Sequence, residues 1–175
     1  MDYRYTYSSQ QKWTPKEKLF LDLAVSYVSN YTGTDFLKDV CLFIGQSLQV
    51  TYTLISSVTE QDGNVAKTLV WTRGSDVLDN ILYTLEGTPC KNALEYGICY
   101  YPDNVTSIFV EDIPLKELQI NSYMGTALSD VKGERLGFIA LMHEGKFADA
   151  ALAEAFLTIL TPSIEEEIVK HHKQW

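Results

Sequence analysis

The chain has 175 residues, 46% of them hydrophobic and 12% aromatic, with 23 acidic against 14 basic residues. This length and apolar fraction favour one globular domain with a single core, and they exclude a disordered chain. The net charge of −9 argues against nucleic acid or an anionic membrane surface as the main partner, because both select for a basic face.

The first helix is predicted over residues 14–33, after a polar, flexible arm at residues 1–13. Thr14, Pro15 and Glu17 form a capping box with a proline at the first helical position, which satisfies two backbone N–H groups. Apolar residues then recur every three or four positions and form one stripe: Phe20, Leu23, Ala24, Tyr27, Val28 and Tyr31.

A second helix is expected directly afterwards, with Thr34 as its N-cap. Its buried face follows the same spacing and consists of Phe36, Leu37, Val40, Cys41, Ile44 and Leu48. Cys41 is therefore interpreted as a small core residue rather than a reactive thiol.

Strands are predicted where helical spacing gives way to alternation and β-branched residues, at 51–59, 65–73, 81–85, 122–129 and 135–143. Asp62 and Gly63 give a strong hairpin-turn signal between the first two strands. Gly125 and Gly137 lie inside strands, where a glycine often marks a bulge or the close approach of another group. Because tight turns join consecutive strands, the sheet should be antiparallel and the fold class α+β.

Residues 86–120 form a long insertion that is predicted to be irregular, with two short helices. Such an insertion inside a compact domain is usually functional. After the last strand, a closing helix is predicted from Asp149, and Pro162 is expected to kink it so that its last stretch forms a separate signalling segment. Residues 171–175 are expected to be a tail.

No motif for metal binding or catalysis is found. The three cysteines and three histidines have no zinc-ligand spacing, so no metal and no catalytic residue is expected. The sequence also lacks a phosphate-binding glycine loop and a nucleophile elbow. Three cysteines are too few for a disulfide framework and favour a cytoplasmic location, and no stretch has the roughly 20 apolar residues of a membrane span.

Five short segments follow one another in a recognisable order: LEGTPC at 85–90, GICYYP at 97–102, Asp112, SYMG at 122–125 and a DxxGxxxG pattern at 130–137. Their order and separation resemble GAF domains, especially those at the front of bacterial sensor histidine kinases and diguanylate cyclases. The resemblance covers most of the chain and assigns residues 34–170 to the domain. Ala127 departs from the pattern, which usually has a proline there.

This resemblance implies a central six-stranded antiparallel sheet. Amphipathic N- and C-terminal helices should pack on one face, and the loop-rich insertion should cover a ligand pocket on the other. Thr88 is expected to cap a short helix that starts at Pro89. The dipole of this helix favours the thiolate of Cys90, but the resemblance implies no general catalytic role for this cysteine, so a structural role is favoured. The pocket candidates lie in the insertion or on neighbouring strands, and most are aromatic side chains that fill apolar space and can orient a ligand. They are Trp71, Tyr83, Cys90, Tyr100, Tyr101, Phe109, Asp112 and Tyr123. The alternative is that these rings only complete the core.

The ligand is left open. Family members that bind cyclic nucleotides carry an Asn-Lys pair after the last strand, which the HEGKF sequence at 143–147 lacks. A covalent bilin needs a cysteine downstream of an Asp-Ile-Pro motif, and no cysteine follows Asp112. Neither a cyclic nucleotide nor a covalent bilin is therefore expected.

Three functions remain. The first is a noncatalytic sensory domain, the input module for a downstream kinase or cyclase domain, which binds a small molecule and forms a homodimer through its terminal helices. The helix residues expected to pack there are Phe20, Leu23, Tyr27, Leu152, Phe156, Ile159, Ile164 and Ile168. The second is a free methionine-(R)-sulfoxide reductase. The absence of a cysteine at residues 118–122, where that family has its catalytic cysteine, argues against it. The third is a ligand-free dimerisation domain.

Overall fold

The computed structural model describes residues 12–59 and 64–172. Its helices are α1 (Pro15–Asn30), α2 (Phe36–Leu48), α3 (Pro89–Tyr96), α4 (Val105–Ile108), α5 (Ile113–Glu117) and α6 (Ala150–His172). Its strands are β1 (Tyr52–Val58), β2 (Val65–Arg73), β3 (Asp76–Val77), β4 (Leu82–Thr84), β5 (Ile98–Tyr101), β6 (Ser122–Ser129) and β7 (Arg135–His143).

The strands form one sheet, and its neighbouring strands are paired antiparallel. Six strands lie in the order β3-β2-β1-β7-β6-β5, and the short β4 pairs with β2 off this path. The predicted α+β class and six-stranded antiparallel sheet are confirmed, with β4 as an additional strand.

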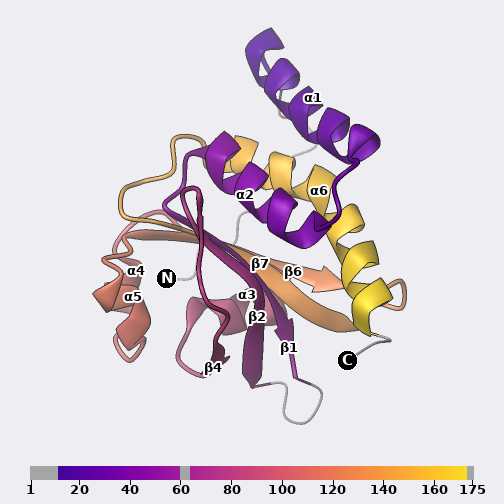
Figure 1. The fold of residues 1–175 in the computed structure, drawn as a ribbon. Helices are drawn as coiled ribbons and strands as arrows, with labels where there is room; N and C mark the ends of the chain where they lie inside the picture. The colour runs from indigo at the N-terminus through magenta and orange to yellow at the C-terminus, as the bar shows by residue number, and fades with distance from the viewer. Residues whose placement is uncertain (1–11, 60–63, 173–175) are drawn as a thin grey trace.

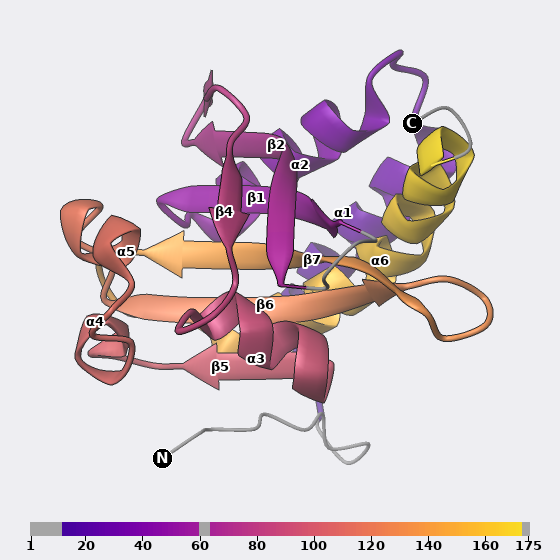
Figure 2. The ribbon, with the colours of Figure 1, turned by 90° about the horizontal axis from the view of Figure 1, so that it is seen from below.

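Helices cover the two faces of the sheet unequally. The three long helices α1, α2 and α6 lie on one face, with α1 outermost (Figure 1). Helix α3 crosses the opposite face, and α4 and α5 lie at one end of the sheet (Figure 2). The terminal helices α1 and α6 pack together, and the rings of Phe20 and Phe156 lie 4.9 Å apart between their centroids.

Each face has its own hydrophobic core. The helix-side core joins α2 and α6 to the sheet and includes Val40, Ile44, Ile55, Leu141, Phe156, Leu160, Ile164 and Ile168. The insertion-side core lies on the other face and includes Tyr52, Leu85, Cys90, Tyr101, Leu115, Tyr123 and Phe138.

The helix starts follow local capping chemistry. Thr14 and Glu17 form the predicted capping box, with the Glu17 N–H donating to Thr14 Oγ1 over 3.3 Å. Helix α1 ends at Asn30, three residues earlier than predicted. The N-cap of α2 is Asp35 and not Thr34, because the Asp35 carboxylate accepts the N–H of Lys38 over 3.3 Å.

The insertion has more regular structure than predicted. Strands β2, β6 and β7 have the predicted bounds, whereas the third predicted strand shortens to β4. Residues 86–120 contain strand β5 and three short helices instead of two. The predicted turn at Asp62 and Gly63 lies outside the described residues, as do most of the N-terminal arm and residues 173–175.

Two strand glycines allow close backbone approach, as predicted. A Cβ atom at Gly137 would lie 1.8 Å from the carbonyl oxygen of Ser56, which belongs to the neighbouring strand β1. A Cβ atom at Gly125 would lie 2.7 Å from Cβ of Ala93 in α3. Larger residues at these positions would force β1 away from β7 or α3 away from the sheet.

Helix α6 runs as one element across Pro162. Ile164 and Ile168, which follow the proline, are 0% and 1% exposed in the helix-side core. The prediction of a separate signalling segment after Pro162 is therefore wrong, because core packing fixes this part of the helix to the sheet.

Burial also corrects the predicted dimer residues. Phe156 lies in the helix-side core with Ile164 and Ile168, so these three side chains are not available to a partner. Leu23, another of the predicted dimer residues, is 50% exposed and lies outside the helix-side core. Cys41 is fully buried, as predicted, and its thiol donates to the Thr53 carbonyl over 3.3 Å. Among the described helices, none is long and apolar enough to cross a membrane.

Candidate functional site

The site begins where the chain leaves β4 and turns into α3. Gly87 has φ of +73°, a left-handed conformation that glycine adopts without strain. Thr88 and Pro89 occupy the N-cap and first helical positions, as predicted. The Thr88 side chain does not cap the helix, however, because its hydroxyl donates to the carbonyl of Leu85 over 2.7 Å. This turn directs Cys90 towards the sheet.

Four polar side chains meet inside the insertion-side core, and we call them the thiol–phenol cluster: Ser56, Tyr83, Cys90 and Tyr123. The Tyr123 hydroxyl donates to Cys90 Sγ over 3.3 Å. Ser56 Oγ and the Tyr83 hydroxyl are hydrogen-bonded over 3.1 Å. The cluster thus joins α3 to strands β1, β4 and β6.

Burial determines the protonation of this cluster. It raises the pKa of the Cys90 thiol to about 12, and it raises the pKa of Tyr123 well above its ordinary value. Desolvation thus opposes the thiolate that the dipole of the eight-residue α3 favours at Cys90. At neutral pH the cluster is uncharged and acts through hydrogen bonds.

Helices α4 and α5 cover one end of the insertion-side core. The rings of Tyr101 and Phe109 meet edge to face, with 5.1 Å between centroids, and Asn92 Nδ2 donates to the Tyr101 hydroxyl over 2.6 Å. Asp112 caps α5 by accepting the N–H of Leu115 over 3.1 Å. Asp112 is half-buried, at the boundary between solvent and core, and this burial raises the pKa of its carboxyl.

One polar atom in this core has no partner. Trp71 Nε1 is buried and has no hydrogen-bond partner among the described residues. The hydroxyl groups of Tyr83, Tyr101 and Tyr123, in the same core, all have partners. A buried unpaired donor costs about 1–3 kcal/mol, so Trp71 marks a position where an added acceptor would be favourable.

The structure brings seven of the eight predicted pocket residues to this side of the sheet. Tyr100 lies on the other face, with its ring 5.7 Å from that of Phe147 in the helix-side core. Tyr100 and Tyr101 are consecutive residues of β5 and point to opposite faces, so both cannot line one pocket. Sequence analysis missed Ser56 and Asn92, which carry no motif of their own.

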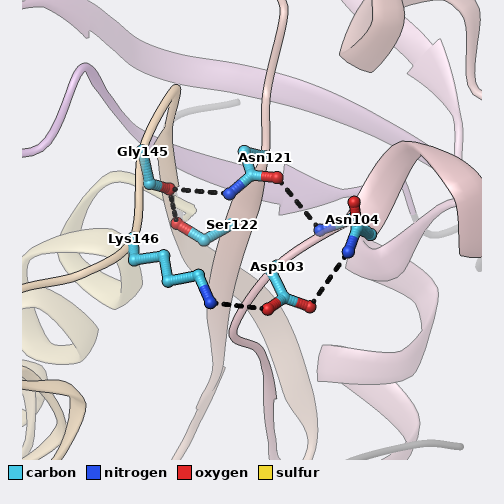
Figure 3. A network of polar contacts seen from close by, with 6 residues as sticks. All are labelled: Asp103, Asn104, Asn121, Ser122, Gly145 and Lys146. Carbon is cyan, nitrogen blue, oxygen red and sulfur yellow. Dashed lines mark hydrogen bonds and ion pairs between the residues drawn. The ribbon is translucent and has the colours of Figure 1, made fainter.

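A polar network, also missed, anchors the start of α4. Its members are Asp103, Asn104, Asn121, Ser122, Gly145 and Lys146 (Figure 3). Lys146 Nζ lies 2.8 Å from the Asp103 carboxylate and lowers its pKa, and Asn104 N–H donates to the Asn121 side chain over 3.1 Å. The Ser122 hydroxyl donates to the Gly145 carbonyl over 2.7 Å. This network ties the segment that covers the site to the connection between β7 and α6.

Within residues 12–59 and 64–172, no three His, Cys, Asp or Glu side chains gather closely enough to hold a metal ion. The polar groups of the candidate site are its phenols, its thiol, the Trp71 indole and the Asp112 carboxyl.

The sequence matches no protein-family model and no curated protein. Solved structures, in contrast, align with most of the chain. The GAF domain of Acinetobacter phosphoenolpyruvate-protein phosphotransferase aligns with a TM-score of 0.67 and 13% identity, over 92% of this chain and 98% of that one. The chain has the GAF-domain fold.

Two further structures have the same fold. The chromophore-binding domain of Stigmatella aurantiaca phytochrome P1 aligns with a TM-score of 0.63 and 11% identity, over 94% of this chain and 67% of that one. Free methionine-R-sulfoxide reductase from Neisseria meningitidis, solved with its substrate, aligns with a TM-score of 0.65 and 14% identity, over 97% of this chain and 100% of that one. GAF-fold proteins of both sensory and enzymatic kinds are thus similar to this chain in structure.

Proposed function

We propose that this chain is a noncatalytic sensory GAF domain, the cytoplasmic input module of a signalling protein of the histidine kinase or diguanylate cyclase type. It binds a small molecule in the insertion-side core and relays the binding through its terminal helices. The observation that carries the proposal is the buried Trp71 Nε1, which has no hydrogen-bond partner among the described residues, in a core where the hydroxyls of Tyr83, Tyr101 and Tyr123 are paired. A ligand with an acceptor group there would satisfy this donor.

The state of the cysteines supports binding rather than catalysis. All three are buried, and burial raises the pKa of both Cys41 and Cys90 to about 12. The Cys99 thiol donates to the Pro89 carbonyl over 3.5 Å. A thiol nucleophile needs an accessible thiolate, which these environments disfavour.

A sulfoxide reductase is the second candidate, because a free methionine-R-sulfoxide reductase aligns with nearly the whole chain. A thioredoxin-coupled assay with free methionine sulfoxide distinguishes the two functions. We expect no NADPH consumption above the rate without protein. Turnover that is lost in Cys90→Ser or Cys99→Ser would overturn the noncatalytic proposal.

The polar network supports a relay to α6. Lys146 pairs with Asp103 in the segment that precedes α4, and the Gly145 carbonyl accepts from Ser122 at the start of β6. Both residues lie in the connection to α6. Phe147, in the same connection, contacts Tyr100 of β5. A ligand that shifts the cover of the site therefore acts on residues that lead directly into the closing helix.

Ligand binding is tested by native mass spectrometry, followed by a thermal-shift screen of cyclic nucleotides, amino acids and small aromatic compounds. A ligand at about 100 times its Kd should stabilise the fold by roughly 2.7 kcal/mol. Trp71→Phe should weaken its binding about tenfold, because the indole donor is lost. Trp13→Phe removes an indole outside the insertion-side core and should leave the affinity unchanged.

Two results would contradict ligand binding in the insertion-side core. Equal affinities of Trp71→Phe and the native chain would place the ligand elsewhere. A native mass spectrum without an added mass, together with no thermal shift in the screen, would favour the ligand-free dimerisation domain.

A further inference from the structure

A concave feature lies on the helix side, away from the insertion-side core. A hollow of about 610 Å³ is lined by the C-terminal half of α1, the connection that follows it and α2. Its walls include three aromatic rings, two amides and one carboxylate: Tyr27, Tyr31, Phe43, Asn30, Gln46 and Asp39. The proposed function gives this hollow no role.

The charge of the hollow has one sign. Of the described residues that line it, Asp39 is the only ionic one, and none is a lysine, arginine or histidine. The nearby Lys38 instead lies 3.5 Å from the Asp35 carboxylate. Among the described residues, no lysine, arginine or histidine lies within ion-pair distance of Asp39. The hollow therefore presents a negative charge without a cation to neutralise it.

The aromatic rings of the hollow pack against one another, and one of them binds the charged group. The Tyr31 hydroxyl donates to the Asp39 carboxylate over 2.7 Å. The ring of Tyr27 stacks on that of Phe43, with 4.1 Å between centroids and 9° between planes, and lies 5.7 Å from the ring of Tyr31. Aromatic faces attract organic cations, and they do so best where water is partly excluded.

Two further observations indicate an incomplete but preorganised site. The Tyr27 hydroxyl is buried and has no hydrogen-bond partner among the described residues. A Cβ atom at position 33 would lie 2.3 Å from the Tyr31 hydroxyl and 2.7 Å from the Asp39 carboxylate, so Gly33 packs directly against this pair. The pair is held in place before any ligand arrives, which reduces the entropy cost of binding.

We propose that the hollow between α1 and α2 binds a small organic cation of the alkylammonium class. The cationic head lies against Asp39 and the faces of the tyrosine rings, and its alkyl groups fill the aromatic wall. Because the lining comes from both helices, the bound cation fixes α1 against α2. This gives the terminal helix an input of its own, separate from that of the insertion-side core.

The test uses the full chain and choline chloride as the probe, with sodium chloride added to hold the ionic strength constant. Titration is followed by ¹H–¹⁵N NMR at the Gly33 amide and at the side-chain amides of Asn30 and Gln46. We expect saturable shifts at these three residues and none at the Trp71 indole. The neutral isostere 3,3-dimethylbutan-1-ol, which has the same shape without the charge, should bind roughly tenfold more weakly.

Two charge-neutralising variants distinguish binding at Asp39 from a general attraction of choline to the acidic chain. Asp39→Asn should weaken choline binding roughly tenfold or more, and Asp22→Asn, on an exposed part of α1, should leave it unchanged. Tyr31→Phe keeps the ring but loses the bond to Asp39, and should retain saturable binding if Asp39→Asn fails to fold. Equal binding of choline and its neutral isostere, equal effects of the two aspartate variants, or shifts that do not saturate would each overturn the proposal.

Discussion

At the residue scale, Cys90 experiences two opposing effects. It occupies the second position of α3, where the helix dipole favours a thiolate, but it is 7% exposed and receives a hydrogen bond from Tyr123. Burial prevails and raises the pKa of the thiol to about 12. The sequence predicted the position of Cys90 in the helix but not its charge, because the charge depends on the segments that cover it, which come from distant parts of the chain.

The raised thiol pKa values predict a loss of stability at alkaline pH. Cys41 and Cys90 have a pKa of about 12 in the folded chain, against the ordinary thiol value of 9.0. A raised folded pKa means that the unfolded chain loses its thiol protons first, so the free energy of unfolding falls as the pH rises above 9. Between pH 8 and pH 10 the loss should be about 1 kcal/mol per thiol.

Urea unfolding of the native chain and of Cys41→Ala at both pH values checks this prediction. The variant is expected to be less stable at both values, but its loss between pH 8 and pH 10 should be smaller by the contribution of one thiol. Identical losses in the two chains would mean that the Cys41 thiol ionises as readily in the folded chain as in the unfolded one.

At the element scale, the sequence predicted the long strands and missed a short one. Strands β2, β6 and β7 have the predicted bounds, and each is eight or nine residues long, which is enough for a strand pattern to be recognised. Strand β5 was missed because its four residues, Ile98–Tyr101, lie between a helix and Pro102 and are too few for a period of two to be recognised. Its pairing with β6 determines which of Tyr100 and Tyr101 reaches the candidate site, and that pairing is not encoded locally.

Helix α6 allows a direct test of the proline inside it. Pro162 has no N–H group to donate to the carbonyl of Thr158, and its ring crowds the preceding turn. Pro162→Ala should therefore increase the free energy of unfolding, by about 1–3 kcal/mol. Chemical denaturation measures the change, with Glu166→Ala on an exposed part of the same helix expected to stay within about 0.5 kcal/mol. A less stable Pro162→Ala variant would mean that the packing of Ile164 and Ile168 requires the bend that proline imposes.

At the scale of the whole molecule, one sheet separates two places where a ligand would act. The insertion-side core connects to α6 through the polar network, whereas the hollow lies between α1 and α2. The effects of ligands at these two places would meet where α1 packs on α6, at Phe20 and Phe156. The sequence predicted that the terminal helices pack together. It did not predict that Phe156 packs within its own chain and not against a second copy, because an amphipathic stripe does not reveal which surface will cover it.

The outer face of α1 remains available as the interface of the proposed homodimer. Leu19 and Leu23, one helical turn apart, are 67% and 50% exposed, and we propose that a second copy of the chain covers them. The double variant Leu19→Glu/Leu23→Glu should sediment as a monomer at concentrations where the native chain is a dimer. Its thermal midpoint, extrapolated to low concentration, should match that of the native chain, because neither residue belongs to the helix-side core.

Val25→Glu is the matched control for this dimer. Val25 is 47% exposed on the same helix, but successive helical residues are about 100° apart, which places it on the opposite flank of the buried stripe. We expect Val25→Glu to remain dimeric in analytical ultracentrifugation. A native chain that is monomeric at high concentration would exclude the dimer, and a monomeric Val25→Glu would move the interface to the other flank of α1. If the native chain is monomeric, the relay through α6 would have to act within one chain, on a partner domain that α6 contacts directly.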